Sequence, residues 1–335
     1  METIFNYYLP EELIAQHPLQ EREKARLMVL DRGNGAIKEG VFWEIDNYLK
    51  AGDTLVLNNS KVIPARLKGI KNTGGKVEIF LLKKIEPYRW EVLLRGNIKQ
   101  GQEYTITNEA DTISARVLEK TDKGSYIAEF DTDDQSDIFR HGETPLPPYI
   151  KRASEKGDKT FYQTVYAEKD GSVAAPTAGL HFTNGLLDTI REKGINIVCL
   201  TLHIGWASFK ILRNEAQSVG EEYMEISEEN AHIINRTKRE KGRVIAVGTS
   251  VVRALESSVK EDIIIPACKH TDLFIKPGVK FRIVDALITN FHLPSSTHLY
   301  LVCAFAGTSL MKKAYKTAVE ERYRFYSYGD AMLII

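Results

Sequence analysis

The pattern of apolar residues changes along the chain, and this change limits the possible fold more than any other feature. Between Lys61 and Glu129, short runs rich in β-branched and aromatic residues are separated by turn sequences at 72–75 and 122–124. The expected strands are Lys76–Leu82, Trp90–Leu94, Tyr104–Thr107, Thr112–Leu118 and Tyr126–Phe130. Short strands at this spacing predict a small antiparallel β-barrel.

After Tyr149 the expected strands alternate with expected helices. Helices over 184–193 and 228–241 follow the capping residues Thr183 and Ser227, and each stops at a glycine. The remaining expected elements are strands Ile195–His203, Arg243–Val247 and Phe281–Thr289, and helices Val251–Ser258 and Ser309–Tyr323. This alternation predicts a mixed or largely parallel sheet covered by helices.

Together the two patterns predict an α/β protein with a mixed, barrel-like sheet, flanking helices and a smaller inserted antiparallel β-barrel domain. Asp53–Asn58 reads as one more strand of the larger sheet, and Pro145–Pro148 as a rigid exit from the barrel. We therefore expect residues 1–59 and 150–335 to form a discontinuous α/β domain. Residues 60–149 would form the inserted barrel domain.

Positive charge is concentrated locally, although the whole chain has 45 basic and 45 acidic residues. Between Ser60 and Gln100, ten basic residues stand against three acidic ones, a balance of +7. The candidates for nucleic-acid contact are Lys61, Arg66, Lys68, Lys71 and Lys76. Such a cluster can attract phosphates, or it can be an ordinary solvated surface, and the sequence leaves both readings open.

The three cysteines, Cys199, Cys268 and Cys303, are isolated, so neither a disulfide framework nor a Cys-x-x-Cys metal site is indicated. The N-terminal residues lack the apolar segment of a signal peptide. The longest apolar stretch, Val284–Ala306, is interrupted by polar residues and a proline, which makes it a poor membrane span. We expect a cytoplasmic protein without membrane contact and without a metal.

The segment Gly171–Thr183, Gly-Ser-Val-Ala-Ala-Pro-Thr-Ala-Gly-Leu-His-Phe-Thr, places small residues and His181 directly before an expected helix. Small residues let a ligand approach the backbone, a helix N-terminus offers free amides, and histidine titrates near neutral pH. A loop that only packs a strand against a helix has the same composition. Spacing alone does not decide between a binding loop and a packing loop.

Ligands of open α/β sheets bind outside the carboxyl ends of the strands. Three polar segments are expected there, at 203–205, 248–253 and 290–292, and with the loop at 176–181 they could form one cleft. Each has a purely structural alternative, such as a backbone-bonded histidine, helix-capping hydroxyls or an ion-paired arginine. The chain has no Gly-x-Gly-x-x-Gly run, which weakens a dinucleotide-binding interpretation.

Several segments together resemble the family of S-adenosylmethionine:tRNA ribosyltransferase-isomerases. They are Leu9–Gln16, Val62–Leu67, Pro145–Ile150, Tyr162–Tyr166, Gly171–Thr183, Leu287–Pro294 and Tyr323–Leu333, in the family's order. The resemblance implies transfer and isomerisation of the ribosyl moiety of S-adenosylmethionine to the 7-aminomethyl-7-deazaguanine base of tRNA. The products would be epoxyqueuosine-tRNA, adenine and methionine.

The resemblance also implies the partners and the site. S-adenosylmethionine is consumed as a substrate, tRNA is the partner, no cofactor or metal is needed, and the protein is a monomer or weak homodimer. The catalytic candidates are His181, His203, Asp285 and His292. The substrate-binding candidates are Tyr149, Pro176, Thr177, Ala178, Gly179, Thr249, Ser250, Arg253 and Asn290. The sulfonium acidifies its neighbouring carbon and the departing adenine benefits from a proton, so histidines and a carboxylate suit this reaction.

Three segments, 206–211, 217–220 and 276–279, depart from the family's usual sequence. In the first, Trp-Ala-Ser-Phe-Lys-Ile stands where the family has Leu-Gly-Thr-Phe-Arg-Pro. Two alternatives therefore stay open beside the family's own reaction. One is a paralogue acting on S-adenosylmethionine or a related nucleoside without tRNA, and the other is a tRNA-binding protein without catalysis.

Overall fold

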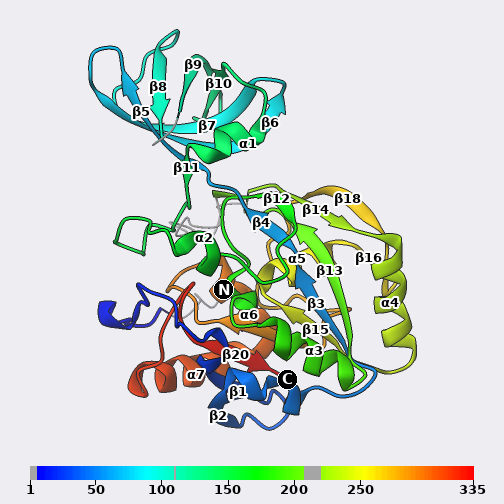
Figure 1. Cartoon of the computed structure of the whole chain (residues 1–335). Coiled ribbons are helices and arrows are strands. Elements are labelled where there is room, and N and C mark those ends of the chain that lie inside the picture. Colours follow the sequence, from blue (N-terminus) through cyan, green and yellow to red (C-terminus); the bar gives the residue numbers. More distant parts are fainter. Residues whose placement is uncertain (1–5, 109–110, 207–219) are drawn as a thin grey trace.

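The structure, a computed structural model, describes residues 6–108, 111–206 and 220–335 and contains one large sheet and one barrel (Figure 1). In order across the large sheet the strands are β18 (Ala267–Thr271), β14 (Glu222–Ile226), β13 (Asn196–Leu202), β3 (Thr54–Asn58), β15 (Val244–Val247), β19 (Ala286–Asn290), β20 (Ala331–Ile334), β1 (Arg26–Leu30) and β2 (Ile37–Val41). The four central strands, β13, β3, β15 and β19, are parallel. The predicted mixed sheet is confirmed. Its described strands form an open row with β18 and β2 as the two edges, so the large sheet is not barrel-like.

The central strands are buried on both faces, which explains their near-continuous apolar sequences. Neighbouring residues of β3 belong to two cores, because Val56 faces one side of the sheet while Leu55 and Leu57 face the other. The first core contains side chains of α4 (Glu228–Arg239), α5 (Thr249–Ser257), α6 (Thr297–Ala306) and α7 (Thr308–Glu320). The second contains those of α3 (Asn184–Glu192) and the 3-10 helix η3 (Phe42–Tyr48). Helices therefore cover both faces of the sheet.

Two of the expected helix caps form as predicted. The Thr183 hydroxyl accepts a hydrogen bond from the Leu186 amide at 3.2 Å, and α3 begins at Asn184. The Ser227 hydroxyl accepts from the Asn230 amide at 3.2 Å and starts α4. These caps depend on contacts within one turn, which is why the sequence alone predicts them.

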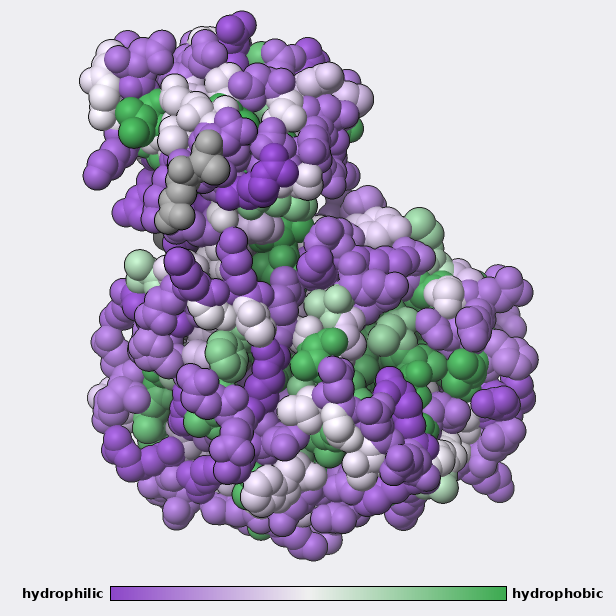
Figure 2. Space-filling model, viewed as in Figure 1, coloured by the Kyte–Doolittle hydropathy of each residue, from purple (hydrophilic) through white to green (hydrophobic). Residues whose placement is uncertain are grey.

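The smaller body is the predicted antiparallel barrel. Its strands in order are β5 (Arg66–Lys71), β6 (Lys76–Glu86), β7 (Arg89–Arg95), β10 (Tyr126–Phe130), β9 (Thr112–Lys120) and β8 (Glu103–Thr107). Pairing of β8 with β5 closes the barrel. Alternate residues such as Tyr104 and Ile106 fill the interior. Figure 2 shows a mostly hydrophilic surface on the visible side of the barrel and hydrophobic residues gathered just beneath it.

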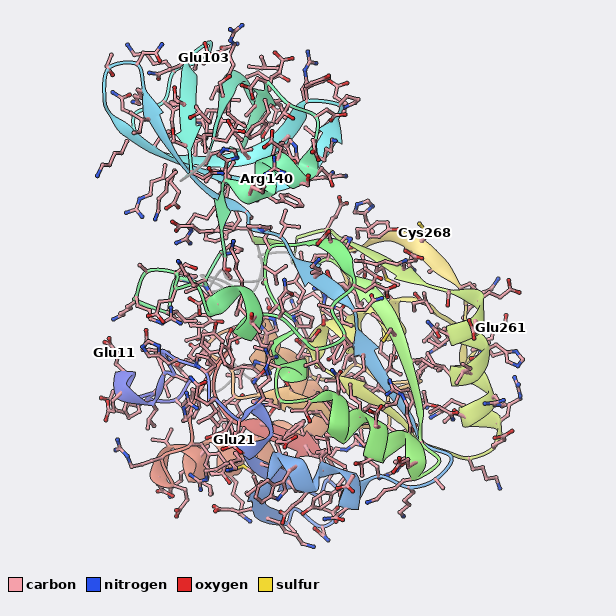
Figure 3. All side chains as sticks on the ribbon, viewed as in Figure 1. Glu11, Glu21, Glu103, Arg140, Glu261 and Cys268 are labelled. Carbon is pink, nitrogen blue, oxygen red and sulfur yellow. The ribbon has the colours of Figure 1, made fainter. Side chains whose placement is uncertain are left out.

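The chain enters the barrel through β4 (Ser60–Val62), which pairs with β12 (Lys169–Ser172). It leaves through α1 (Gln135–Arg140) and β11 (Gly142–Glu143), followed by the proline-rich exit. Figure 3 shows Arg140 on the side of the barrel that faces the larger body, and Glu103 at the far end. One face of the barrel thus looks toward the large sheet.

One expectation about a single element needs correction. The strand expected over 281–289 begins only at Ala286, because the amides of residues 282–284 donate to the Glu256 carboxylate instead of to a neighbouring strand. The pairing of β1 with β20 was not anticipated, since it joins the two ends of the chain.

None of the described helices is long and apolar enough to cross a membrane.

Candidate active site

A cleft lies outside the carboxyl ends of the central strands. Ile204 follows β13, Gly248 follows β15, and Asn290 is the last residue of β19; all three line the cleft. This is the edge of the sheet at which ligands of α/β proteins bind. The predicted substrate-binding residues Tyr149, Pro176, Thr177, Ala178, Thr249, Ser250, Arg253 and Asn290 line it together, as does the predicted catalytic residue His292.

Helix α5 points its N-terminus at the cleft. Gly248 precedes the helix with φ +93°, a conformation that favours glycine, and no side chain caps the first turn among the described residues. The interpretation of Thr249 and Ser250 as capping residues is therefore wrong, because both lie inside the helix. Their position puts the positive end of the helix dipole at the cleft.

Arg253 forms an ion pair, which was the structural alternative that the sequence allowed for this residue. Its Nη1 contacts Glu222, and its Nε donates to the Leu273 carbonyl at 2.9 Å. Glu222 also accepts from the Gly205 amide at 3.0 Å. Both charged side chains are largely buried and both line the cleft. The ion pair is consequently part of the cleft wall.

Two neutral histidines lie side by side in the cleft. The rings of His292 and His298 stack with centroids 5.3 Å apart, and His292 Nε2 lies 2.8 Å from the Thr289 hydroxyl. Burial holds the pKa of His292 well below its usual range and lowers the pKa of His298 to about 4. Both imidazoles are therefore uncharged at pH 7 and each has a nitrogen able to accept a proton.

His181 lies behind the cleft rather than on its lining. Its Nε2 is 3.3 Å from the Asn290 amide nitrogen, while the Thr177 hydroxyl donates to Asn290 Oδ1 at 2.8 Å. Burial lowers the pKa of His181 to about 4, so the ring is neutral and can accept from Asn290. Thr177 and His181 together fix the orientation of the Asn290 amide at the end of β19.

Two catalytic candidates are separated from the cleft. The His203 ring bonds the Ser60 hydroxyl at 2.7 Å and stacks on Tyr223, outside the cleft lining. The Asp285 carboxylate bonds Lys238 at 2.7 Å and accepts from the Val244 amide, at the amino end of β19. A strand's length separates Asp285 from Asn290, so the expectation that these groups meet in one cleft is corrected.

Among the described residues, Gly179, Trp206, Gly220 and the departing segment 276–279 are also outside the cleft lining. A Cβ on Gly179 would come within 1.9 Å of the Tyr166 hydroxyl, so this glycine permits packing rather than ligand approach. Trp206 packs against Phe80 of the barrel, with ring centroids 4.7 Å apart. The remaining departures at 207–211 and 217–219 lie outside the described residues.

The cleft residues that the sequence did not predict include Glu222, His298, Tyr326 and Ser327. Glu222 sits in an alternating strand with no motif around it. His298 is the second residue of α6 after the Ser296 cap, a local signal that could have singled it out. Tyr326 and Ser327 lie within the resembling segment Tyr323–Leu333, but far in sequence from the rest of the cleft.

Two of the five basic candidates on and near β5 form surface ion pairs with carboxylates. Lys61 lies 3.5 Å from Asp170, and Lys68 lies 2.5 Å from Glu143. Lys71 donates to the Asn97 carbonyl, Arg66 donates to the Leu146 carbonyl at 3.2 Å, and Lys76 is exposed on β6. Surface ion pairs of this kind are weak, so these cations can still attract phosphates.

A cleft with a fixed cation and uncharged histidines at the carboxyl edge of an α/β sheet is typical of an enzyme. The chain belongs to the queuosine biosynthesis protein family, whose family model matches residues 3–334. It is 49% identical to an S-adenosylmethionine:tRNA ribosyltransferase-isomerase of Sulfurihydrogenibium sp., covering 99% of this chain and 98% of that one. It is 50% identical to the enzyme of that name from Halothermothrix orenii, over 99% and 98% of the two chains.

A solved structure agrees with this assignment. The crystal structure of an S-adenosylmethionine tRNA ribosyltransferase from Thermotoga maritima superposes with a TM-score of 0.59 and shares 38% sequence identity. The similarity covers 99% of this chain and 100% of that one. In the parts of the chain that the structure describes, no cluster of three or more His, Cys, Asp or Glu side chains is placed to hold a metal ion.

The packing of Gly179 gives a first prediction. Gly179→Ala should lower the thermal midpoint, because the new methyl group collides with Tyr166 inside a packed loop; overpacking costs about 1–3 kcal/mol. Gly185→Ala is the matched control, since a Cβ at Gly185 meets nothing within 4 Å. Thermal unfolding of both variants checks the prediction. Equal midpoints for the two would contradict the packing role.

The buried histidines give a second prediction, about pH. The pKa of His298 is about 4 in the folded chain against an ordinary 6.5, so the unfolded chain takes up the proton first as pH falls. This contribution to stability is complete above pH 6.5 and is lost progressively toward pH 4. Between pH 7 and 4.5, the thermal midpoint of the His298→Gln variant should therefore fall less than that of the wild type. The exposed His232→Gln is the control; the same loss in all three proteins would refute the prediction.

Proposed function

We propose that this protein is an S-adenosylmethionine:tRNA ribosyltransferase-isomerase. It moves the ribosyl moiety of S-adenosylmethionine to the 7-aminomethyl-7-deazaguanine base of tRNA and rearranges it, giving epoxyqueuosine-tRNA, adenine and methionine. The observation that carries the proposal is the family match over residues 3–334, because that span contains every element of the cleft.

The division of labour within the chain belongs to the same proposal. Residues 1–59 and 150–335 form the catalytic domain, since all lining residues of the cleft except Tyr149 come from the second of these segments. Residues 60–149 form an inserted domain whose positive residues contact tRNA. Because its substrate is tRNA, the protein acts in the cytoplasm. It is a monomer or weak homodimer. S-adenosylmethionine is a substrate, and no cofactor is needed.

The proposed proton chemistry uses His292 and His298. One neutral imidazole takes the proton from the carbon next to the sulfonium. Adenine later leaves with the electron pair of its glycosidic bond, and the imidazolium returns a proton to it. Two rings whose centroids are 5.3 Å apart do not readily carry two charges, so the pair holds one proton at a time. Asn290, oriented by Thr177 and His181, donates or accepts a hydrogen bond at the same place.

Release of adenine tests the proposal directly. Adenine should form from S-adenosylmethionine only when tRNA bearing the aminomethyl base is present, because the family reaction couples glycosidic cleavage to transfer. Chromatography of reactions with modified tRNA, unmodified tRNA and no tRNA gives the answer. Adenine in all three reactions would favour a paralogue that does not need tRNA. Adenine in none, with tRNA still bound, would favour a non-catalytic binding protein.

The positions of the histidines predict different effects of two variants. His292→Gln should lower turnover by about 10²–10⁴, the usual effect of losing a general acid–base group. His203→Gln should change turnover much less, because His203 lies outside the cleft on Ser60 and Tyr223. Single-turnover rates of both variants check this. The reverse order of effects would assign the proton chemistry to His203.

Salt dependence tests the barrel's role. Binding of tRNA should weaken with salt, and changing Lys68, Lys71 and Lys76 together to Ala should make the slope of log K against log salt shallower by about 1 per lost phosphate contact. The matched control changes Lys312, Lys313 and Lys316 of α7, on the opposite end of the molecule in Figure 1. Equal slopes for both triple variants would move the tRNA contact off this part of the barrel.

A further inference from the structure

We propose that the cleft binds S-adenosylmethionine in one direction, with its amino-acid end at Arg253 and Glu222. The ribose then lies beside His292 and His298, and the adenine points toward Tyr326. This inference rests on the proposed function and assigns a separate subsite to each part of the substrate.

The charged end matches the charges of an amino acid. Among the described residues of the lining, Glu222 is the single carboxylate and Arg253 the single arginine or lysine. The methionyl group of the substrate has one carboxylate and one ammonium, so it needs a cation and an anion at neighbouring positions. The Arg253–Glu222 pair presents both, already in contact with each other.

The guanidinium of Arg253 is held in place with one nitrogen unused. Nε donates to the Leu273 carbonyl and Nη1 contacts Glu222, whereas Nη2 is buried and has no hydrogen-bond partner in the described part of the chain. A buried charged donor without a partner is unfavourable. A carboxylate from the ligand would satisfy it through a charge-assisted hydrogen bond.

Helix α5 adds to the positive character of the same end. Thr249 and Ser250 of its first turn line the cleft, and Arg253 lies one turn further along the helix. The aligned dipoles of the helix favour an anion at this terminus. The apolar residues Leu273, Phe274 and Ile275 line the cleft as well and can contact the methylene groups of the methionyl chain.

A series of contacts leads from the charged end to the opposite end. The charge of Arg253 is close enough to help lower the pKa of His298, and His298 stacks on His292. Next to His292, the Phe291 carbonyl accepts from the Tyr326 amide at 3.1 Å. The two histidines therefore lie between the charged end and Tyr326, which is where a substrate bound in the proposed direction has its ribose.

The far end is aromatic and rigid. Tyr326 packs against Tyr149 with ring centroids 4.4 Å apart and ring planes tilted by 31°, and both rings line the cleft. The backbone of Tyr326 has φ +72°, a conformation that aromatic residues rarely adopt, within a turn in which its carbonyl accepts from the Gly329 amide at 2.9 Å. Its hydroxyl is buried with no partner among the described residues. A purine ring fits such an end by stacking, whereas a carboxylate does not.

Binding of a substrate analogue that lacks only the carboxylate tests the direction. Dissociation constants are measured by calorimetry for S-adenosylmethionine and for its decarboxylated form. Saturating tRNA with unmodified guanine is present, so that no transfer consumes the ligand. The wild type should prefer S-adenosylmethionine by about tenfold or more, the effect of a lost charge-assisted pair.

The variants show which side chain binds the carboxylate of the ligand. Arg253→Gln should bring the ratio of the two constants close to one, and Arg253→Gln combined with Glu222→Gln should do the same without leaving an unpaired buried carboxylate. Tyr326→Leu should weaken both ligands by the same factor and keep the wild-type ratio. A ratio preserved in the Arg253 variants but abolished by Tyr326→Leu would overturn the proposed direction while leaving the proposed function standing. A folded wild type that binds neither ligand would contradict both.

Discussion

The buried side chain of Asn58 joins the parts of the molecule that meet at the cleft. It is the last residue of β3, its Nδ2 donates to the Leu202 carbonyl at 2.9 Å, and its Oδ1 accepts from the Leu202 amide at 3.0 Å. The same amide group contacts the Ser250 hydroxyl at 3.3 Å and the Ser60 amide at 3.1 Å. One residue thus aligns the ends of β3 and β13 with the first turn of α5 and with the strand that leads to the barrel. Because every partner is buried, removing the Asn58 side chain would leave several polar groups without a hydrogen bond. Each such group lowers the stability of the fold by about 1–3 kcal/mol.

The aligned strand ends explain how a chain with no net charge and no metal cluster in its described part can form a reactive site. Burial keeps His292 and His298 neutral, and the hydrogen bonds of Asn290 and Arg253 fix their polar groups before any ligand arrives. Preorganised groups in a dry cleft stabilise developing charge without first having to reorient. The proposed chemistry therefore depends on the same packing that stabilises the sheet.

Features with local causes could be predicted from the sequence. Helix caps at Thr183 and Ser227 and the antiparallel barrel follow from neighbouring residues, and they are confirmed. The two ends of the chain, paired as β1 and β20, have no local signal. Membership of the cleft was predictable where a loop follows a strand, as with Thr177 or Arg253.

The direction of a side chain was not predictable at the end of a strand, where neighbouring residues point to opposite sides. His203 follows β13 directly, yet its ring turns toward Ser60, and Ile204 lines the cleft instead. Asp285 comes just before β19, so its carboxylate lies at the amino end of the strand, whereas the cleft lies at the carboxyl end. Glu222 and Tyr326 reach the cleft only through tertiary contacts with α5 and with Phe291. Such contacts leave no periodic pattern in the sequence.

The central claim is that the cleft at the carboxyl ends of β13, β3, β15 and β19 is where S-adenosylmethionine reacts. A crystal structure of the protein with S-adenosylmethionine and unmodified tRNA tests it most directly. The account predicts the ribose next to His292 and His298, within reach of Asn290. Ligand bound instead in the groove below the barrel, between Phe139 and Lys159, with the cleft empty, would contradict it.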